Sequence, residues 1–431
     1  RSVYYRSCVK CRWWHGDVIM SKRKVVITGL GLVSPLGNDV PTFWQNVKAN
    51  RSGVGPITLI DSSDLAVKIA GEVKNFDPSK KIDPKDAKKM DRFAQFAVYA
   101  ALEALESSNL PKESLDPIRT GVCLGTGQGG TNTIEESVIR LTEKGPNRVP
   151  PMTVAKGLAN FGAAQIALSL GVHGPNMTVV TACAAATDAI GQAMHLIRDG
   201  HADIMFTGGS EASIARMCMA SFINIQALSI RNDEPDKASR PFDRDRDGFV
   251  MSEGAGILVL EEYEHAKARG AKIYAEIAGF GSTCDAHHLT APDPEGLWVS
   301  KAIGIALNDA QLKPEDIDYV SAHGTSTPLN DPIETKAIKN AFGDHAYKLK
   351  ISSLKSMIGH CIGAAGAIET IAAILGMNEN YVHSTINLDN PDPECDLDYV
   401  PNKGINMPVR AFVKNSMGFG GQNAVLVITK P

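Results

Sequence analysis

The stretch Val179-Val180-Thr181-Ala182-Cys183-Ala184-Ala185-Ala186 joins a β-branched run to a run of small residues. β-Branched residues favour strands and alanine favours helix, so the stretch predicts a short strand that turns directly into a helix. Backbone N–H groups at a helix N-terminus lack partners and the helix dipole is positive there, so we expect the thiol of Cys183 to ionise readily. On position alone, however, Cys183 is more simply interpreted as a small, inert core residue.

Strands and helices are predicted to alternate on both sides of this stretch. Segments with the apolar spacing of a helix, such as 90–107, separate short runs that are rich in β-branched and apolar residues. Those runs cover residues 25–29, 120–124, 178–181, 204–207 and 257–260. This alternation predicts a layered α/β fold.

A weak internal repeat divides the chain near residue 270. Residues 118–127 and 317–325 each read as a strand that ends in Gly-Thr, whereas 252–260 and 420–428 each read as a glycine turn that leads into an apolar strand. We therefore expect two pseudo-repeated halves.

Each half also contains one helix built from small and apolar residues. These predicted helices cover residues 184–198 and 363–375, and their apolar positions run almost all the way round. A helix of this kind must be buried on every side, so we expect both to lie at the centre of the layers.

Composition limits the classes of function. The chain has 431 residues, a formal net charge of −4 and 43% hydrophobic residues. The charge gives no general attraction to nucleic acid, and no apolar run reaches the roughly 20 residues that a membrane helix needs. The eight cysteines have no disulfide-framework spacing, which suits free thiols in a reducing, cytoplasmic compartment.

Residues 1–19 precede Met20 and have no apolar core of a signal peptide, so we interpret them as a leader or an added extension. Cys8, Cys11 and His15 form one incomplete metal-binding pattern there, which is weak support for zinc. Asp285 and His288 could also suggest a metal, but without a clear third ligand a hydrogen-bonded structural role is favoured.

Two histidines in the second half change the interpretation of Cys183. His323 lies in Ser-Ala-His-Gly-Thr after a predicted strand, and His360 lies in Lys-Ser-Met-Ile-Gly-His just before the second small-residue helix. The N-terminal half, 20–270, would then supply a nucleophile, and the C-terminal half, 271–431, would supply two imidazoles. A cysteine with a nearby histidine is the minimum set for covalent catalysis.

The chain resembles the β-ketoacyl-acyl carrier protein synthases of the thiolase superfamily, and most closely their type II, elongating members. The resemblance runs from about residue 22 to residue 429 and rests on several motifs in order. These are Thr181-Ala182-Cys183, Arg240-Pro241-Phe242-Asp243, Asp247-Gly248-Phe249-Val250, His323-Gly324-Thr325-Ser326-Thr327, Lys355-Ser356 with Gly359-His360, Gly363-Ala364-Ala365-Gly366-Ala367 and Gly418-Phe419-Gly420-Gly421. Such members have two thiolase-like halves in an αβαβα core.

The resemblance implies a two-step condensation. Cys183 would take an acyl group from acyl carrier protein, with the backbone N–H groups of Cys183 and Phe419 as an oxyanion hole. His323 and His360 would hold the thioester carbonyl of malonyl-carrier protein while CO₂ leaves, and the resulting carbanion would attack the acyl-enzyme. The resemblance implies a homodimer and requires no redox cofactor or catalytic metal.

The resemblance also assigns supporting residues. Lys355 and Glu369 would organise the histidines, and Thr325 and Thr327 would hydrogen bond the pantetheine arm. Elongating synthases commonly carry an apolar residue where this chain has Gln128, at the far end of the acyl pocket. The polar side chain therefore leaves the acyl chain-length preference open.

Several other activities compete with this prediction. A thiolase would be expected to carry a second catalytic cysteine in a Cys-x-Gly segment, where this chain has Gly418-Phe419-Gly420-Gly421. An initiating synthase would be expected to have an asparagine in place of one histidine. A cysteine hydrolase could use Cys183 with one histidine but would not need two. A non-catalytic partner that sets chain length in a polyketide-type heterodimer normally lacks the nucleophile, so the presence of Cys183 argues against it. A catalytic polyketide ketosynthase remains the principal alternative.

Overall fold

A computed structural model describes residues 23–431 of the chain. The predicted extension 1–19, with Cys8, Cys11 and His15, lies outside the described residues. Within residues 23–431, no helix is long and apolar enough to cross a membrane.

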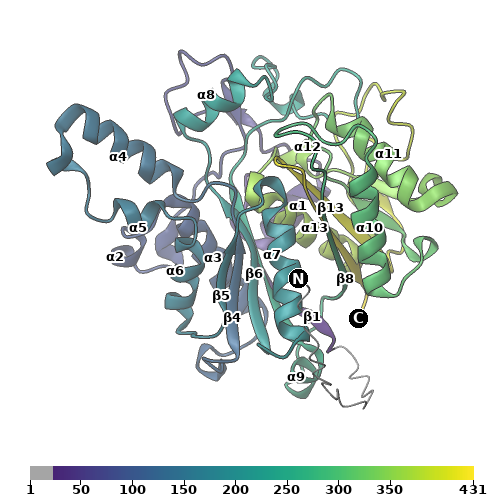
Figure 1. Cartoon of the computed structure of the whole chain (residues 1–431), viewed down its shortest axis with the longest axis horizontal. Helices are drawn as coiled ribbons and strands as arrows, with labels where there is room; N and C mark the ends of the chain where they lie inside the picture. The colour runs from purple at the N-terminus through teal and green to yellow at the C-terminus, as the bar shows by residue number, and fades with distance from the viewer. Residues whose placement is uncertain (1–22) are drawn as a thin grey trace, which may run out of the picture.

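Ten strands form one large mixed sheet in the order β10-β9-β13-β14-β8-β1-β7-β6-β4-β5 (Figure 1). Strands β1 and β8 join its two halves and pair over only two residues of each strand. The strands are β1 (Val25–Val33), β4 (Thr120–Gly125), β5 (Asn176–Val179), β6 (Ile204–Glu211), β7 (Gly254–Glu262), β8 (Ala275–Cys284), β9 (Tyr319–Ser321), β10 (Lys350–Ser352), β13 (Ala411–Gly418) and β14 (Gln422–Thr429).

The strand order confirms the internal repeat. Read outward from the β1–β8 junction, one half runs β1-β7-β6-β4-β5 and the other runs β8-β14-β13-β9-β10. The repeated sequence segments supply β4 and β9, which both stand fourth, and β7 and β14, which both stand second. The chain passes between the halves after α9 (Tyr263–Ala268), and residue 270 as a domain boundary stays a prediction.

Helices complete a layered arrangement, as predicted (Figure 1). Helices α3 and α6 pack on the first half of the sheet and α10 packs on the second, with α11 against α10. Between the halves, α7 and α13 contact each other and strands of both. The bounds are α3 (Arg92–Ser107), α6 (Phe161–Leu170), α7 (Ala185–Arg198), α10 (Leu297–Ala310), α11 (Asn330–Phe342) and α13 (Ala365–Glu379).

The remaining elements are short or lie at the periphery of the layers. The helices are α1 (Val40–Lys48), α2 (Pro84–Ala87), α4 (Thr131–Lys144), α5 (Thr153–Gly157), α8 (Arg216–Asn224) and α12 (Lys355–Ile358). Two-residue strands form two small pairs, β2 (Gly55–Pro56) with β3 (Ile69–Ala70) and β11 (Tyr381–Val382) with β12 (Ile405–Asn406).

Small residues let the central helices approach each other closely. Twelve of the fifteen residues of α13 are buried, as the all-round apolar pattern predicts. A Cβ atom on Gly366 would lie only 2.2 Å from the Thr187 hydroxyl oxygen of α7. The two central helices can therefore touch only because Gly366 has no side chain, and this contact brings the segments before both helices together.

The segment around Cys183 differs slightly from its prediction. Strand β5 ends at Val179, and a 3-10 turn, η4 (Ala182–Ala184), precedes α7. The equivalent turn η8 (Ile362–Ala364) precedes α13. Cys183 therefore lies in a tight turn between strand and helix, and not in the first turn of the helix itself.

Candidate active site

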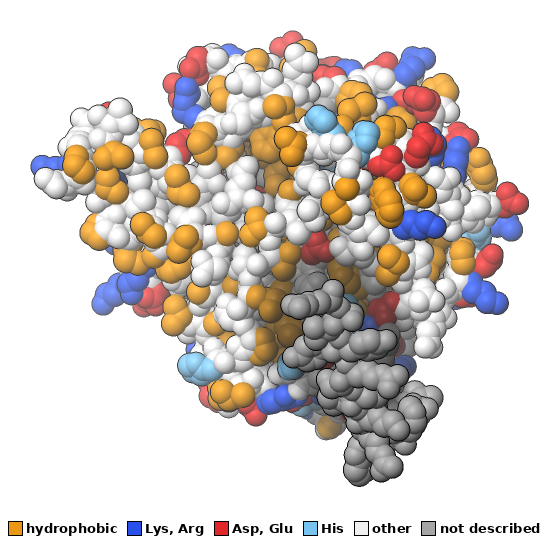
Figure 2. Space-filling view, in the orientation of Figure 1, with side chains coloured by type: hydrophobic (Ala, Val, Ile, Leu, Met, Phe, Trp, Pro, Cys, Tyr) orange, Lys and Arg blue, Asp and Glu red, His pale blue; other side chains and the backbone are white. Residues whose placement is uncertain are grey.

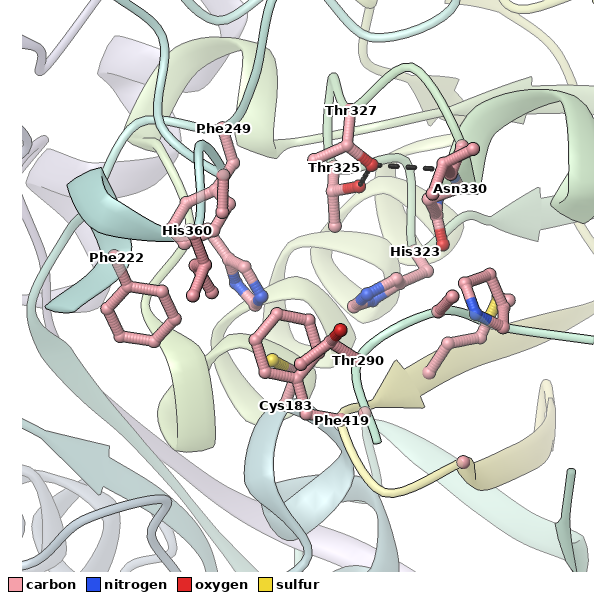
Figure 3. Close-up of a pocket in the computed structure, with 18 of the residues that line it drawn as sticks. Cys183, Phe222, Phe249, Thr290, His323, Thr325, Thr327, Asn330, His360 and Phe419 are labelled. Carbon is pink, nitrogen blue, oxygen red and sulfur yellow. Dashed lines mark hydrogen bonds between the residues drawn. The ribbon is translucent and has the colours of Figure 1, made fainter. Parts of the chain in front are cut away.

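A cavity of about 370 Å³ brings together residues from both halves of the chain (Figure 3). It receives Cys183 from the turn before α7, His323 from the loop after β9 and His360 from the loop before η8. Its lining also includes Phe222, Ile225, Gln226, Ala227, Phe249, Asp285, Thr290, Ala291, Pro292, Thr325, Thr327, Pro328, Leu329, Asn330, Ile362, Met417, Gly418, Phe419, Gly421 and Asn423. The structure thus brings together the three residues that the sequence predicted to be catalytic.

The thiol of Cys183 is held in a constrained and nearly buried turn. Cys183 is 9% exposed. The preceding Ala182 has a φ of 48°, a left-handed conformation that costs about 1–2 kcal/mol for a residue with a Cβ atom. The backbone N–H groups of Phe419 and Cys183 act on the thiol and lower its pKa. The turn therefore presents the sulfur to the cavity beside two backbone N–H groups.

Burial has the largest effect on the protonation of this thiol. Desolvation raises the pKa of Cys183 to about 12, although the Lys355 charge and the two backbone donors lower it in part. The expectation that Cys183 ionises readily at rest is therefore wrong. Because the resting group is a thiol, it must lose its proton when it attacks.

The Gly418–Gly421 loop joins β13 to β14 and lies directly against the cysteine turn. A Cβ atom on Gly418 would lie 2.7 Å from the Thr181 carbonyl oxygen and 3.3 Å from the Cys183 nitrogen. Because Gly418 has no side chain, the backbone of the neighbouring Phe419 can lie close to the thiol. The Phe419 ring lies 6.2 Å from the Phe222 ring, centroid to centroid, at the cavity wall.

The backbone of His323 is clamped on both sides. Its N–H donates to Glu334 Oε1 at 2.7 Å, and the Gly324 N–H donates to Glu334 Oε2 at 2.7 Å. Its carbonyl accepts from Lys355 Nζ at 2.6 Å. These contacts fix the main chain, whereas the ring Nδ1 atom is buried and has no hydrogen-bond partner among the described residues.

His360 is also held by hydrogen bonds of its backbone, whereas its ring nitrogens remain available to a ligand. Its N–H donates to the Val250 carbonyl at 2.7 Å, and its own carbonyl accepts from the Ser252 N–H at 3.0 Å. The ring packs edge-on to Phe249 with centroids 5.2 Å apart. Within residues 23–431, neither ring nitrogen has a hydrogen-bond partner. Two buried imidazoles therefore have unused hydrogen-bonding nitrogens.

Burial and nearby positive charge keep both imidazoles neutral near pH 7. Desolvation, followed by the positive charge of Lys355, holds the pKa of His323 and of His360 well below 6.5. Near pH 7, each ring can donate one hydrogen bond and accept one.

Lys355 and Glu369 form a buried ion pair beneath the histidines. Lys355 Nζ lies 2.5 Å from Glu369 Oε1, and both side chains are 1% exposed. Two further residues, Glu334 and Lys414, belong to this charged group and were not predicted from the sequence. A lysine within the apolar strand sequence Ala411-Phe412-Val413-Lys414 was an available signal, because lysine is seldom buried without a partner.

The other predicted site residues fall in two groups. Thr325 and Thr327 line the cavity, with their hydroxyl oxygens 2.9 Å apart. Gln128 lies outside it, where its Oε1 accepts from the Cys218 thiol at 2.8 Å. A contact of Gln128 with the acyl chain stays a prediction.

The Asp285–His288 loop makes ordinary hydrogen bonds. Asp285 Oδ1 accepts from Asn423 Nδ2 at 2.6 Å, and His288 Nδ1 accepts from the Thr290 N–H at 3.1 Å. Across residues 23–431, His, Cys, Asp and Glu side chains form no group of three or more that could hold a metal ion.

Comparisons with known proteins agree with this architecture. The β-ketoacyl synthase N-terminal domain model matches residues 22–266, and the C-terminal domain model matches residues 274–389. The 3-oxoacyl-[acyl-carrier-protein] synthase 2 of Synechocystis is 50% identical over 95% of this chain and 99% of its own length. The protein of that name from Staphylococcus aureus strain COL is 49% identical over 95% of this chain and 98% of its own.

A solved structure has the same overall fold. It is a type II polyketide synthase ketosynthase in complex with its acyl-carrier protein and bound to the hexaketide. The match has a TM-score of 0.89 and 39% identity, and it covers 95% of this chain and 100% of that one. Both domain models and relatives of nearly full length therefore place this chain in the β-ketoacyl synthase family.

Proposed function

We propose that this protein is a 3-oxoacyl-[acyl-carrier-protein] synthase. It condenses a malonyl group on acyl carrier protein with an acyl group held on Cys183 and lengthens a fatty acyl chain by two carbons. The observation that carries the proposal is the arrangement of one thiol, two backbone N–H donors and two neutral imidazoles around one cavity. The curated relatives named above support the same reaction.

The first step transfers the acyl group. The Cys183 sulfur attacks the thioester carbonyl of the acyl-carrier protein, and its proton passes to an imidazole nitrogen that has no partner in the resting site. The carbonyl oxygen becomes an oxyanion, and the Cys183 and Phe419 N–H groups stabilise it. The bond to the carrier sulfur then breaks, and that sulfur takes the proton, so the site returns to neutral imidazoles.

The second step forms the carbon–carbon bond. Cleavage of the bond to the malonyl carboxylate releases CO₂ and moves its electron pair toward the thioester carbonyl, which becomes an enolate. His323 and His360 donate hydrogen bonds to that oxygen, and as neutral donors they stabilise the enolate without readily protonating it. The enolate carbon attacks the acyl-Cys183 carbonyl, and the Cys183 sulfur leaves as a thiolate. That thiolate takes a proton from solvent, because loss of CO₂ from the malonyl carboxylate supplies none.

Lys355, Glu369, Thr325 and Thr327 have supporting roles in this proposal. Lys355 holds the His323 carbonyl, and Glu369 pairs with Lys355. The two threonine hydroxyls face the cavity, where they can hydrogen bond the amide groups of a pantetheine arm. The carrier partner is supported by the ketosynthase structure that contains its acyl-carrier protein.

The protein is proposed to act as a homodimer in the cytoplasm. Exposed apolar side chains gather over α4, α5 and α6 beside the edge strand β5 (Figure 2). A second copy would cover such a surface, because contiguous apolar patches usually mark interfaces. The exposed apolar residues of this surface include Ile134, Val138, Ile139, Leu141, Val154, Leu168 and Met177.

The proposed compartment is supported by the cysteines. Six described cysteines are free thiols, which supports a reducing compartment.

A reconstituted reaction tests the activity. The purified protein is incubated with an acyl-carrier protein and malonyl-carrier protein, and CO₂ and carrier-bound products are measured. We expect equal amounts of CO₂ and a 3-oxoacyl product two carbons longer than the donor. Hydrolysis of the acyl donor without condensation would instead indicate a cysteine hydrolase. Repeated extension without reduction would indicate a polyketide ketosynthase, which the fold match keeps as the second candidate.

A further inference from the structure

Lys414 is a fully buried cation that the proposed reaction steps do not use. It lies on β13 with a side chain that is 0% exposed, and its Nζ atom lies 2.7 Å from Glu369 Oε2. Glu369 Oε1 lies 2.5 Å from Lys355 Nζ, so one carboxylate pairs with an ammonium group on each oxygen. The fully buried Glu334 also acts on Lys414, so two lysines face two buried carboxylates in this group. Loss of Lys414 would therefore leave a buried negative charge without its counter-charge, next to the groups that hold the His323 backbone.

The position of Lys414 connects it to His323 through three contacts. Lys414 contacts Glu369, Glu369 contacts Lys355, and Lys355 donates to the His323 carbonyl at 2.6 Å. The next residue of the strand, Asn415, donates from Nδ2 to Glu334 Oε1 at 3.3 Å. Glu334 in turn accepts the His323 N–H. Two adjacent residues of β13, Lys414 and Asn415, therefore contact Glu369 and Glu334, the two carboxylates that keep the His323 backbone in place.

Charged and titratable groups surround this cluster from several elements. The positive charge of Lys414 acts on both imidazoles and lowers the pKa of each. Its effect follows those of desolvation and Lys355 and, for His323, that of His360. The groups that face the cluster are Glu369 from α13, Lys355 from α12, Glu334 from α11, His323 and His360 from the cavity loops, Cys183 from η4, Cys361 beside His360, Tyr319 from β9 and His383 after β11.

We propose that Lys414 is a positioning residue for the condensation, which holds the Glu369 carboxylate so that Lys355 keeps the His323 backbone in place. Its charge also opposes protonation of the two imidazoles, so it preserves their neutral, hydrogen-bond-donating form at mildly acidic pH. The inference rests on the proposed function, because it assigns Lys414 to the imidazoles of the second step.

The variant Lys414→Met removes the charge and keeps a long apolar side chain. Wild-type protein is first shown to release CO₂ and to form the 3-oxoacyl product, since its failure there would contradict the proposed function itself. We then expect Lys414→Met to lower kcat about tenfold, with KM for malonyl-carrier protein changed less than about twofold. The acidic limb of its kcat profile should move toward neutral pH by roughly half a unit or more, because one charge that opposes imidazole protonation is gone.

Lys350→Met is the matched control, because Lys350 pairs with Asp398 at 2.5 Å on strand β10 of the same sheet half. It should retain the wild-type kcat and acidic limb. Lys414→Gln, also uncharged, is measured in parallel, and circular dichroism reports the folding of each variant. Folded Lys414 variants with an unshifted acidic limb would overturn the proposal. Failure of both variants to fold would also overturn it, since Lys414 would then serve the fold alone.

Discussion

The imidazole rings of His323 and His360 stand edge to face with their centroids 5.5 Å apart, at an interplanar angle of 84°. They come from the loop after β9 and the loop before η8, and they line one cavity (Figure 3). Both rings are buried and have nitrogen atoms without a hydrogen-bond partner in the part of the chain that the structure describes. A ligand oxygen between the rings would therefore satisfy two donors at once. This relationship makes the protonation state of the pair the first property to test.

Condensation should persist at mildly acidic pH. Burial and Lys355 hold the pKa of both histidines well below 6.5, so protonation, which would prevent the neutral donor role, begins only at lower pH. A profile of kcat for malonyl decarboxylation from pH 5 to 8 should show an acidic limb with an apparent pKa below 6.5, the value of an ordinary histidine. A limb at or above that value would contradict neutral, desolvated imidazoles.

Much of this arrangement was predictable from the sequence, because it depends on local patterns and ordered motifs. The β-branched runs predicted strands that the structure contains. The all-round apolar pattern of 184–198 predicted a buried central helix, which is α7. The ionisation of Cys183 was not predictable, since desolvation depends on how segments distant in sequence enclose the sulfur. Lys414 was missed because its partner Glu369 comes from another helix, and sequence spacing alone does not reveal that contact.

Replacement of the nucleophile should stop the first step without unfolding the protein. Cys183→Ser removes the sulfur and keeps a side chain of similar size, and we expect condensation to fall at least about 1,000-fold. Intact-protein mass spectrometry after incubation with acyl-carrier protein should show the acyl adduct on wild-type protein and none on the variant.

Cys395→Ser provides the control for this experiment. Cys395 is also buried, but it lies in the core of the second half, outside the cavity. This variant should still form the acyl adduct. Normal condensation by Cys183→Ser would rule out Cys183 as the nucleophile.

The contact between the central helices should be intolerant of even one added methyl group. Gly366→Ala would place a Cβ atom 2.2 Å from Thr187 Oγ1 and 3.0 Å from the Thr187 backbone nitrogen, so α7 and α13 must move apart. We expect the free energy of unfolding to fall by about 1–3 kcal/mol, as measured by urea denaturation.

Gly304→Ala is the control for helix propensity. Gly304 lies on α10, and a Cβ atom there would have no other atom within 4 Å. This substitution should raise the free energy of unfolding by about 0.5–1 kcal/mol, because alanine loses less backbone entropy than glycine. An equal effect of the two substitutions would show that the helix contact is not tight.

Gln128 should limit the length of the acyl donor. Its amide accepts a hydrogen bond from Cys218, and a long acyl chain that reached this point would have to bury its methylene groups against polar atoms. We expect kcat/KM of wild-type protein to fall as the donor lengthens toward sixteen carbons, and Gln128→Ile to raise it for the longest donors by about tenfold, with little change for short ones. Gln45→Ile, on the exposed face of α1, should leave the profile unchanged. Full wild-type activity with sixteen-carbon donors would show that Gln128 imposes no such limit.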